Sequence, residues 1–212
     1  MSRFIKFIGV AVLGLALMLT SCDGKKEKEN NDLESEEVKG LIVENTISTD
    51  RESAFLKFSN DYRWFETCID LEKYLDEEND GVVLGVSNVF QVVEDRDSDG
   101  YDTRVILYAH AYGESTIEVK DYAFWVGDLP LNEEEVKLTF KDAFDRLMQA
   151  NLPKPHSKHC VLRKELGPKN CNPQYIFGNT RSQVYVDAVT GCVTDKNPVY
   201  EGFDSPREPS WP

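Results

Sequence analysis

Apolar and polar positions along residues 41–203 follow the two spacings that distinguish helices from strands. Within residues 52–76, apolar side chains recur every three to four positions, which predicts a helix that ends at the polar run 76–81. β-Branched and aromatic residues then dominate three stretches, which predicts strands at residues 82–93, 103–111 and 116–126. Both alternating sets of the middle strand are bulky, so we expect it to be covered on both faces.

A second helix is predicted to begin after Thr139. The Thr139 side chain can cap this helix, and Asp142 occupies the N3 position of a capping box. The apolar stripe of this helix is regular: Phe140, Ala143, Phe144, Leu147 and Met148. The prolines of "NLPKP" end the helix, and strands are predicted at residues 159–166, 174–178 and 183–189.

The stretches "LTFKDAFDRLMQANLP" and "VYVDAVTGCV" resemble a PepSY-type module. The residues that carry this resemblance in the last strand and its turn are Tyr185, Val186, Asp187, Thr190, Gly191 and Val193. The resemblance implies a helix packed on a small antiparallel sheet, in an extracytoplasmic binding or protease-inhibitory segment that has no catalytic residues. In physical terms, Asp187 and Thr190 can accept bonds from backbone donors of the turn, and Gly191 permits a positive φ.

The predicted fold class is therefore α+β. We expect two helix-plus-three-stranded antiparallel units, PepSY-like or cystatin-like, at residues 41–132 and 133–203, linked by a disulfide. We expect Trp64 and Trp125 to anchor the core. A proline-rich tail follows at residues 204–212.

The N-terminus has the features of an export signal. Arg3 and Lys6 precede an apolar run at residues 7–19, which is too short to span a bilayer. The next residues, Leu19-Thr20-Ser21-Cys22, resemble the lipobox of bacterial lipoproteins. This resemblance implies a signal peptide at residues 1–21 and acylation of Cys22. The polar stretch that follows, up to residue 40, is predicted to be a disordered tether. The implied acylation anchors the protein in the cell envelope, on the outer membrane or the cell surface, and the choice between its periplasmic face and the cell surface stays open.

The charge of the chain narrows the choice of partners. The formal net charge is −14, and removal of Arg3 and Lys6 with the signal peptide leaves −16. Such an acidic surface disfavours nucleic acid and anionic lipid as partners and favours cations and basic peptides.

Four cysteines besides Cys22 predict two disulfides in an exported chain, with three possible connectivities. A hairpin turn at Thr180–Arg181 places Cys171 opposite about residue 190, next to Cys192. The preceding hairpin places Cys160 opposite about residue 179 rather than opposite Cys171. We therefore predict the pair Cys171–Cys192, which leaves Cys68 on the first helix to join Cys160.

The acidic stretch "EDRDSDGYDT" is a candidate calcium loop. Carboxylate and carbonyl oxygens are the ligands that calcium prefers, and the candidate ligands here are Asp95, Asp97, Asp99, Tyr101 and Asp102. The twelfth position of an EF-hand would be Ile106, which cannot ligate, so a calcium hairpin between two strands is the form to expect. The alternative is an acidic hairpin in which the aspartates and Gly100 serve the turn alone.

Three histidines are the candidate catalytic residues. His156 and His159 lie close to Cys160, but an extended segment would point the two rings to different faces. His110, between two alanines of a predicted strand, is expected to be packed or hydrogen-bonded. The chain has no Gly-rich phosphate loop, no Gly-x-Ser-x-Gly elbow and no His-Glu-x-x-His sequence.

These observations predict a lipid-anchored envelope lipoprotein that is not an enzyme and requires no cofactor. Its expected function is to bind a protein or peptide, or to inhibit a protease. Two alternatives remain open, which are a calcium-stabilised structural lipoprotein and an envelope enzyme that uses His110 or His156/His159.

The lipobox predicts the behaviour of a Cys22→Ser variant. Because the variant lacks the thiol that receives an acyl chain, we expect mass spectrometry to detect no lipid and a detergent-free wash to release the protein from membranes. Cys68→Ser is the matched control and should stay lipidated. A Cys22→Ser protein that stays in the membrane, with the mass that the wild type shows, would contradict the lipoprotein assignment.

Overall fold

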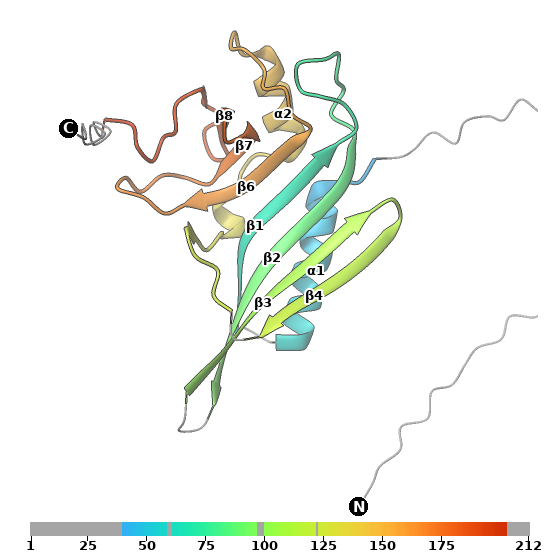
Figure 1. Ribbon diagram of the computed structural model, residues 1–212, viewed down its shortest axis with the longest axis vertical. Coiled ribbons are helices and arrows are strands. Elements are labelled where there is room, and N and C mark those ends of the chain that lie inside the picture. The colour runs from blue at the N-terminus through green and yellow to red at the C-terminus, as the bar shows by residue number, and fades with distance from the viewer. Residues whose placement is uncertain (1–39, 59–60, 97–99, 122, 203–212) are drawn as a thin grey trace, which may run out of the picture. The chain divides into compact units, whose positions relative to one another are not determined.

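The computed structural model describes residues 40–58, 61–96, 100–121 and 123–202, without the side chains of residues 94–102. The described chain is α+β, with two α-helices on one antiparallel sheet (Figure 1). The elements are α1 (Val43–Phe58), β1 (Tyr62–Leu71), β2 (Val83–Arg96), β3 (Gly100–Ala111), β4 (Glu114–Asp121), β5 (Asp128–Leu129), the 3-10 helix η1 (Glu133–Glu135), α2 (Phe140–Gln149), β6 (His159–Glu165), β7 (Gln174–Asn179), β8 (Ser182–Asp187) and β9 (Val193–Thr194).

One sheet runs through both halves of the chain. Its strand order is β4-β3-β2-β1-β6-β7-β8-β9, and β5 pairs with the end of β6. The two helix-and-strand units expected from the sequence do not form two sheets, because they are halves of one sheet joined where β1 pairs antiparallel with β6.

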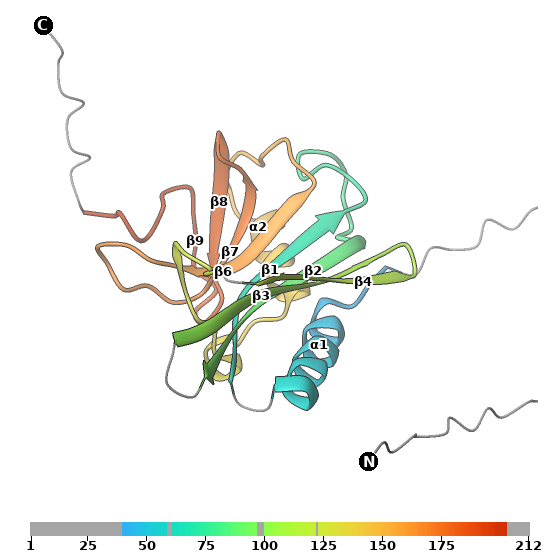
Figure 2. The same ribbon diagram turned by 60° about the horizontal axis from the view of Figure 1, so that its bottom comes forward.

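Both helices contribute to the same hydrophobic core. Val43 and Ile47 of α1 belong to one buried cluster with Phe140 and Phe144 of α2. The two helices therefore pack on the same face of the sheet, and no helix of the described residues packs on the opposite face (Figure 2). Glu44 of α1 also accepts a hydrogen bond, at 2.6 Å, from the backbone N–H of Phe140 at the start of α2.

The helix predicted at residues 52–76 is misplaced. The first helix is α1, and residues 62–71 form strand β1. Four consecutive residues of β1 are buried, from Trp64 to Thr67, because a β-bulge and cover on both faces hide the usual alternation. Apolar residues buried on both faces of β1 produced the spacing that resembled a helix. α1 was overlooked because its buried side carries an aspartate, Asp50, between Ile47 and Ala54.

The other predicted elements are close to the observed ones. β2, β3, β6, β7 and β8 lie within a few residues of their predicted bounds, while β4 ends at Asp121 rather than at residue 126. Thr139 caps α2 in a complete capping box with Asp142, as predicted. In the turn after β8, the backbone N–H groups of Val189 and Thr190 donate to Asp187, and Gly191 has a φ of +75°. Burial alone would raise the pKa of Asp187, but these hydrogen bonds outweigh it and the pKa lies below its usual value.

The strand register shows how the cysteines of the predicted disulfides lie relative to one another. All four described cysteines are free thiols. Cys68 lies on β1, not on a helix, and faces Val161 of β6, whereas Cys160 faces Ile69. Because neighbouring residues of a strand point to opposite faces, Cys68 and Cys160 lie on different faces of the sheet and cannot bond. Backbone pairing, not a disulfide, joins the two halves.

The hairpin of β7 and β8 has the predicted register, since Gln174 pairs with Asp187. In the preceding hairpin Cys160 pairs with Phe177, two positions from the predicted partner at residue 179. Cys171 precedes β7 and is therefore not the partner of Cys160. Cys171 and Cys192 line one hollow beside the turn after β8 without a bond between them. The structure thus supports the proximity of Cys171 to Cys192 and not their oxidation.

Several predictions fall on residues that the structure does not describe. The signal peptide, Cys22, the tether and the proline-rich tail lie outside the described residues. The backbones of residues 94–96 and 100–102 pair as the end of the β2–β3 hairpin, but the side chains of Asp95, Tyr101 and Asp102, and all of residues 97–99, lie outside the description. The calcium loop therefore stays a prediction. Among the described residues, neither helix has the length and apolar character needed to cross a membrane.

Candidate functional site

A buried carboxylate, Asp50, lies at the centre of a row of hydrogen-bonded side chains between α1 and the sheet. We call this row the polar chain, and its members are Trp64, Thr67, Asn88, Asp50, His110 and Ser115. The residues of α1 that face the sheet are Val43, Ile47, Asp50 and Ala54, at the three-to-four residue spacing of one helix face. This spacing places Asp50 in the core, where its residue exposure is 2%. A carboxylate in such a position is costly unless hydrogen-bond donors surround it.

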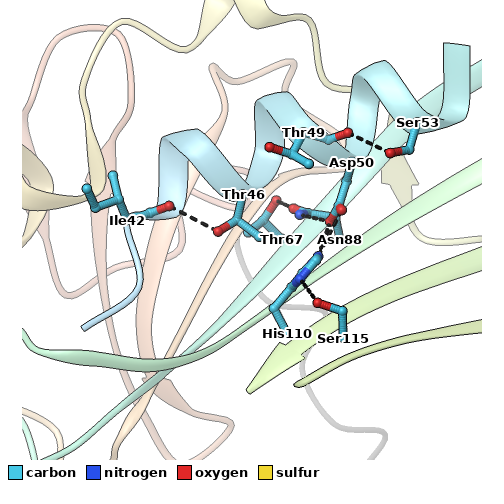
Figure 3. Close-up of polar contacts among 9 residues, drawn as sticks. All are labelled: Ile42, Thr46, Thr49, Asp50, Ser53, Thr67, Asn88, His110 and Ser115. Atoms are coloured by element: carbon cyan, nitrogen blue, oxygen red, sulfur yellow. Dashed lines mark hydrogen bonds and ion pairs between the residues drawn. The ribbon is translucent and has the colours of Figure 1, made fainter. Parts of the chain in front are cut away.

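Two side chains from neighbouring strands supply those donors (Figure 3). Asn88 of β2 donates from Nδ2 to Asp50 Oδ2 at 2.7 Å. His110 of β3 places Nε2 at 2.8 Å from Oδ1 and 3.0 Å from Oδ2. Behind Asn88 the chain continues through the Thr67 hydroxyl, which donates to Asn88 Oδ1 and receives a bond from the indole N–H of Trp64.

Ser115 of β4 completes the chain at its exposed end. Ser115 and His110 are cross-strand partners, which brings the hydroxyl oxygen to 2.8 Å from His110 Nδ1. A carboxylate can only accept, so Nε2–H of His110 donates to Asp50, and in a neutral ring Nδ1 then accepts from the Ser115 hydroxyl. Burial, followed by the negative charge of Asp50, raises the pKa of Tyr108.

The order serine, histidine, aspartate is also that of hydrolase triads, in which the histidine removes the serine proton. Acyl transfer further requires donors for an oxyanion and a place for the substrate. Every residue of β4, Ser115 included, is exposed, and Ser115 lines neither the hollow described below nor the one beside the turn after β8. The clearest role of the polar chain is structural, because its hydrogen bonds connect α1 to four successive strands, β1 to β4.

The sequence predicted only part of the polar chain. His110 is hydrogen-bonded on a strand, as predicted. Asp50, Asn88 and Ser115 were missed, although an aspartate at a core position of an amphipathic helix is a signal that a buried partner exists.

The other two histidines do not form a joint site. His156 stacks on Tyr74, with ring centroids 4.2 Å apart, and places Nδ1 3.0 Å from Asp76. His159 places Nδ1 3.1 Å from Asp70, its cross-strand partner. Each ring thus has its own aspartate, and the described residues contain no group of three ligands that could hold a metal ion.

A second feature is a hollow of about 320 Å³ on the face of the sheet opposite α1 and α2. Its charged floor comes from the ends of β5 and β6, and its residues are Val126, Gly127, Asp128, Arg163, Glu165, Leu166 and Tyr200. Arg163 belongs to this face because its neighbour Leu162 points into the core on the helix side. We call this feature the acidic hollow.

Carboxylates outnumber the single cation of the acidic hollow. The Arg163 guanidinium bonds Glu165 and lies 3.7 Å from Glu66 and 3.8 Å from Asp128. Burial raises the pKa of Asp128, although the bond from the Trp125 indole and the nearby Arg163 oppose this effect. Trp125 is half-buried and donates a hydrogen bond to Asp128, so the expectation that it anchors the core is wrong. Trp64 is in the core as predicted.

Exposed apolar side chains surround the acidic hollow. Val126, Leu166 and Tyr200 line it with exposed fractions of 81%, 58% and 56%, and Phe124 is exposed two residues before Val126. Large apolar side chains gathered around a charged depression are typical of a surface that contacts another protein. The sequence did not reveal this surface, because its residues come from three separate segments.

Comparisons with known proteins add no relative. No protein-family model, no curated protein and no solved structure matches this chain.

The polar chain predicts the stability of an Asp50→Ala variant. Asn88 and His110 would lose their buried acceptor, so we expect the free energy of unfolding to fall by about 2 kcal/mol and the melting temperature by roughly 4–8 °C. Ser53→Ala is the matched control on α1, because its hydroxyl bonds only the backbone of Thr49 at the surface. Equal melting temperatures for the two variants would contradict the structural role of Asp50.

Proposed function

We propose that the protein is a lipid-anchored lipoprotein of the bacterial cell envelope that binds a protein or peptide without catalysis. Three features support this proposal, which are the lipobox-like sequence at Cys22, the resemblance of residues 138–193 to a PepSY-type module, and the acidic hollow. The observation that carries the proposal is the acidic hollow, with exposed Val126, Leu166 and Tyr200 around it.

The chemistry of the acidic hollow indicates its partner. Two carboxylates, Asp128 and Glu165, line the hollow with one guanidinium, and the whole chain has a net charge of −14. A partner segment with a lysine or arginine flanked by apolar side chains complements both the charge and the rim. A protease whose surface carries such a segment would be the partner in the inhibitory form of this function.

A pull-down with matched variants tests this proposal. The full chain in a non-ionic detergent is immobilised and exposed to envelope proteins of the source cells. Val126→Ser combined with Tyr200→Ser removes the rim of the hollow, so we expect at least a tenfold loss of a protein that the wild type retains.

The control for this experiment removes comparable apolar surface elsewhere. Ile42→Ser combined with Leu56→Ser alters residues that are 59% and 78% exposed, outside the hollow. The control should retain the partner. Equal retention by all three proteins, or equal loss from both variants, would exclude the acidic hollow as the binding surface.

A second candidate function, hydrolysis, is favoured by one observation, the hydrogen-bonded order Ser115, His110, Asp50. In this candidate the Ser115 oxygen bonds to the carbonyl carbon of an ester while its proton moves to His110 Nδ1, and the C–O bond to the alcohol breaks as the alcohol leaves with that proton. A fluorophosphonate, which reacts with activated serines and releases fluoride, distinguishes the two functions.

The binding-module proposal predicts no labelling of Ser115 by the fluorophosphonate. Labelling that disappears in both Ser115→Ala and His110→Ala, and persists in Ser53→Ala, would establish the hydrolase in place of the non-catalytic module.

A further inference from the structure

β4 is a long edge strand that no described residue outside β3 covers. It stands at one end of the strand order and pairs only with β3 (Figure 1). All eight of its residues are exposed. α1 makes its main contacts with β1 and β2, the two strands farther from this edge.

The hairpin geometry determines which backbone groups of β4 are free. Tyr112 and Gly113, with φ of +53° and +80°, form a two-residue loop between Ala111 and Glu114. In such a hairpin the flanking residues form a hydrogen-bonded pair, and bonded and non-bonded pairs then alternate along the ladder. Glu114 and every second residue after it therefore bond to β3. The N–H and C=O groups that point away from the sheet belong to Ser115, Ile117, Val119 and Asp121.

The side chains of this free edge have two distinct faces. Ile117 and Val119 lie on the helix side of the sheet, next to Tyr108 and Ile106 of β3, and remain 60% and 43% exposed. The other side carries Glu114, Thr116, Glu118 and Lys120. An added strand would thus meet Ile117 and Val119 on one face, and two glutamates with a single lysine on the other.

The charges on and around β4 indicate which kind of strand could pair with it. Lys120 is paired with Glu118 at 3.5 Å, and Glu114 forms no ion pair with any described residue. A second copy of this chain would bring another net charge of −14 to the edge, which opposes self-pairing. A cationic strand, with lysine or arginine on one face and β-branched residues on the other, matches both faces of β4.

We propose that β4 receives an extended cationic segment of a partner protein as an additional antiparallel strand. The backbone groups of Ser115, Ile117 and Val119 bond the segment, its apolar side chains pack on Ile117 and Val119, and its basic side chains face Glu114 and Glu118. This strand site shares no residue with the acidic hollow and does not depend on it.

A labelled heptapeptide of alternating lysine and valine, acetylated and amidated, is the probe. Fluorescence anisotropy measures its binding to the full chain in a non-ionic detergent. In the proposed pairing the valine amides point at β4 and the lysine amides point away. N-methylation of the valines should abolish binding, and N-methylation of the lysines should leave affinity within about threefold. Equal binding of both methylated peptides would show attraction by charge alone and would overturn the proposal.

Variants of the protein locate the site. Ile117→Pro removes an amide that bonds nothing in the sheet, so the strand should remain and the affinity for the unmodified peptide should fall at least tenfold. Val119→Pro does the same one pair further along and serves if the first variant does not fold. Ile117→Val is the control and should bind like the wild type.

The double variant Val126→Ser with Tyr200→Ser separates this site from the acidic hollow. We expect it to bind the peptide like the wild type. Loss of the peptide from this variant together with normal binding to Ile117→Pro would place the peptide in the hollow and overturn the strand site. Absence of binding to the wild type would also overturn it.

Discussion

The antiparallel pairing of β1 with β6 is the contact on which the rest of the structure depends. Each of these strands is the first long strand of its half, and each follows the helix of that half, so their pairing makes one sheet and places both helices on the same face. The core is then shared, and neither half could be separated without exposing a strand edge and part of that core. The same pairing sets Glu66 opposite Arg163 on the other face, where Arg163 contributes to the floor of the acidic hollow.

The polar chain around Asp50 adds specificity to this apolar arrangement. Asp50 must find Asn88 and His110 at the same time, and these lie on neighbouring strands as residues of one face. A shift of either strand by one residue would turn its partner side chain to the opposite face and leave a buried carboxylate short of donors. Hydrophobic burial alone tolerates such shifts better, because many of the strand residues are apolar on both faces. The buried charge therefore penalises the wrong registers of β2 and β3 and the wrong position of α1.

The sequence predicted what depends on local order and missed what depends on partners distant in the chain. The capping box of Thr139, the stripe of α2 and the turn at Asp187 involve residues within a few positions of one another, and all three are present. β1 was taken for a helix because its cover on both faces comes from segments far along the chain, which local spacing cannot encode. The β7–β8 register was predictable from a short turn, whereas the facing of Cys68 depends on the β1–β6 pairing. Of the candidate site, His110 was noticed, but Asp50 and the acidic hollow assemble only in the folded sheet.

The two edges of the sheet differ in a way that bears on function. At one end, β9 is only two residues long and offers few free backbone groups. This is a usual protection of an edge against unwanted pairing. At the other end, β4 presents eight exposed residues with apolar Ile117 and Val119 among them. Its protection is charge, and charge of one prevailing sign is selective, because it repels a second acidic chain while attracting a basic strand. An edge strand that repels a second copy of the chain and attracts a basic strand has the properties that the proposed strand site requires.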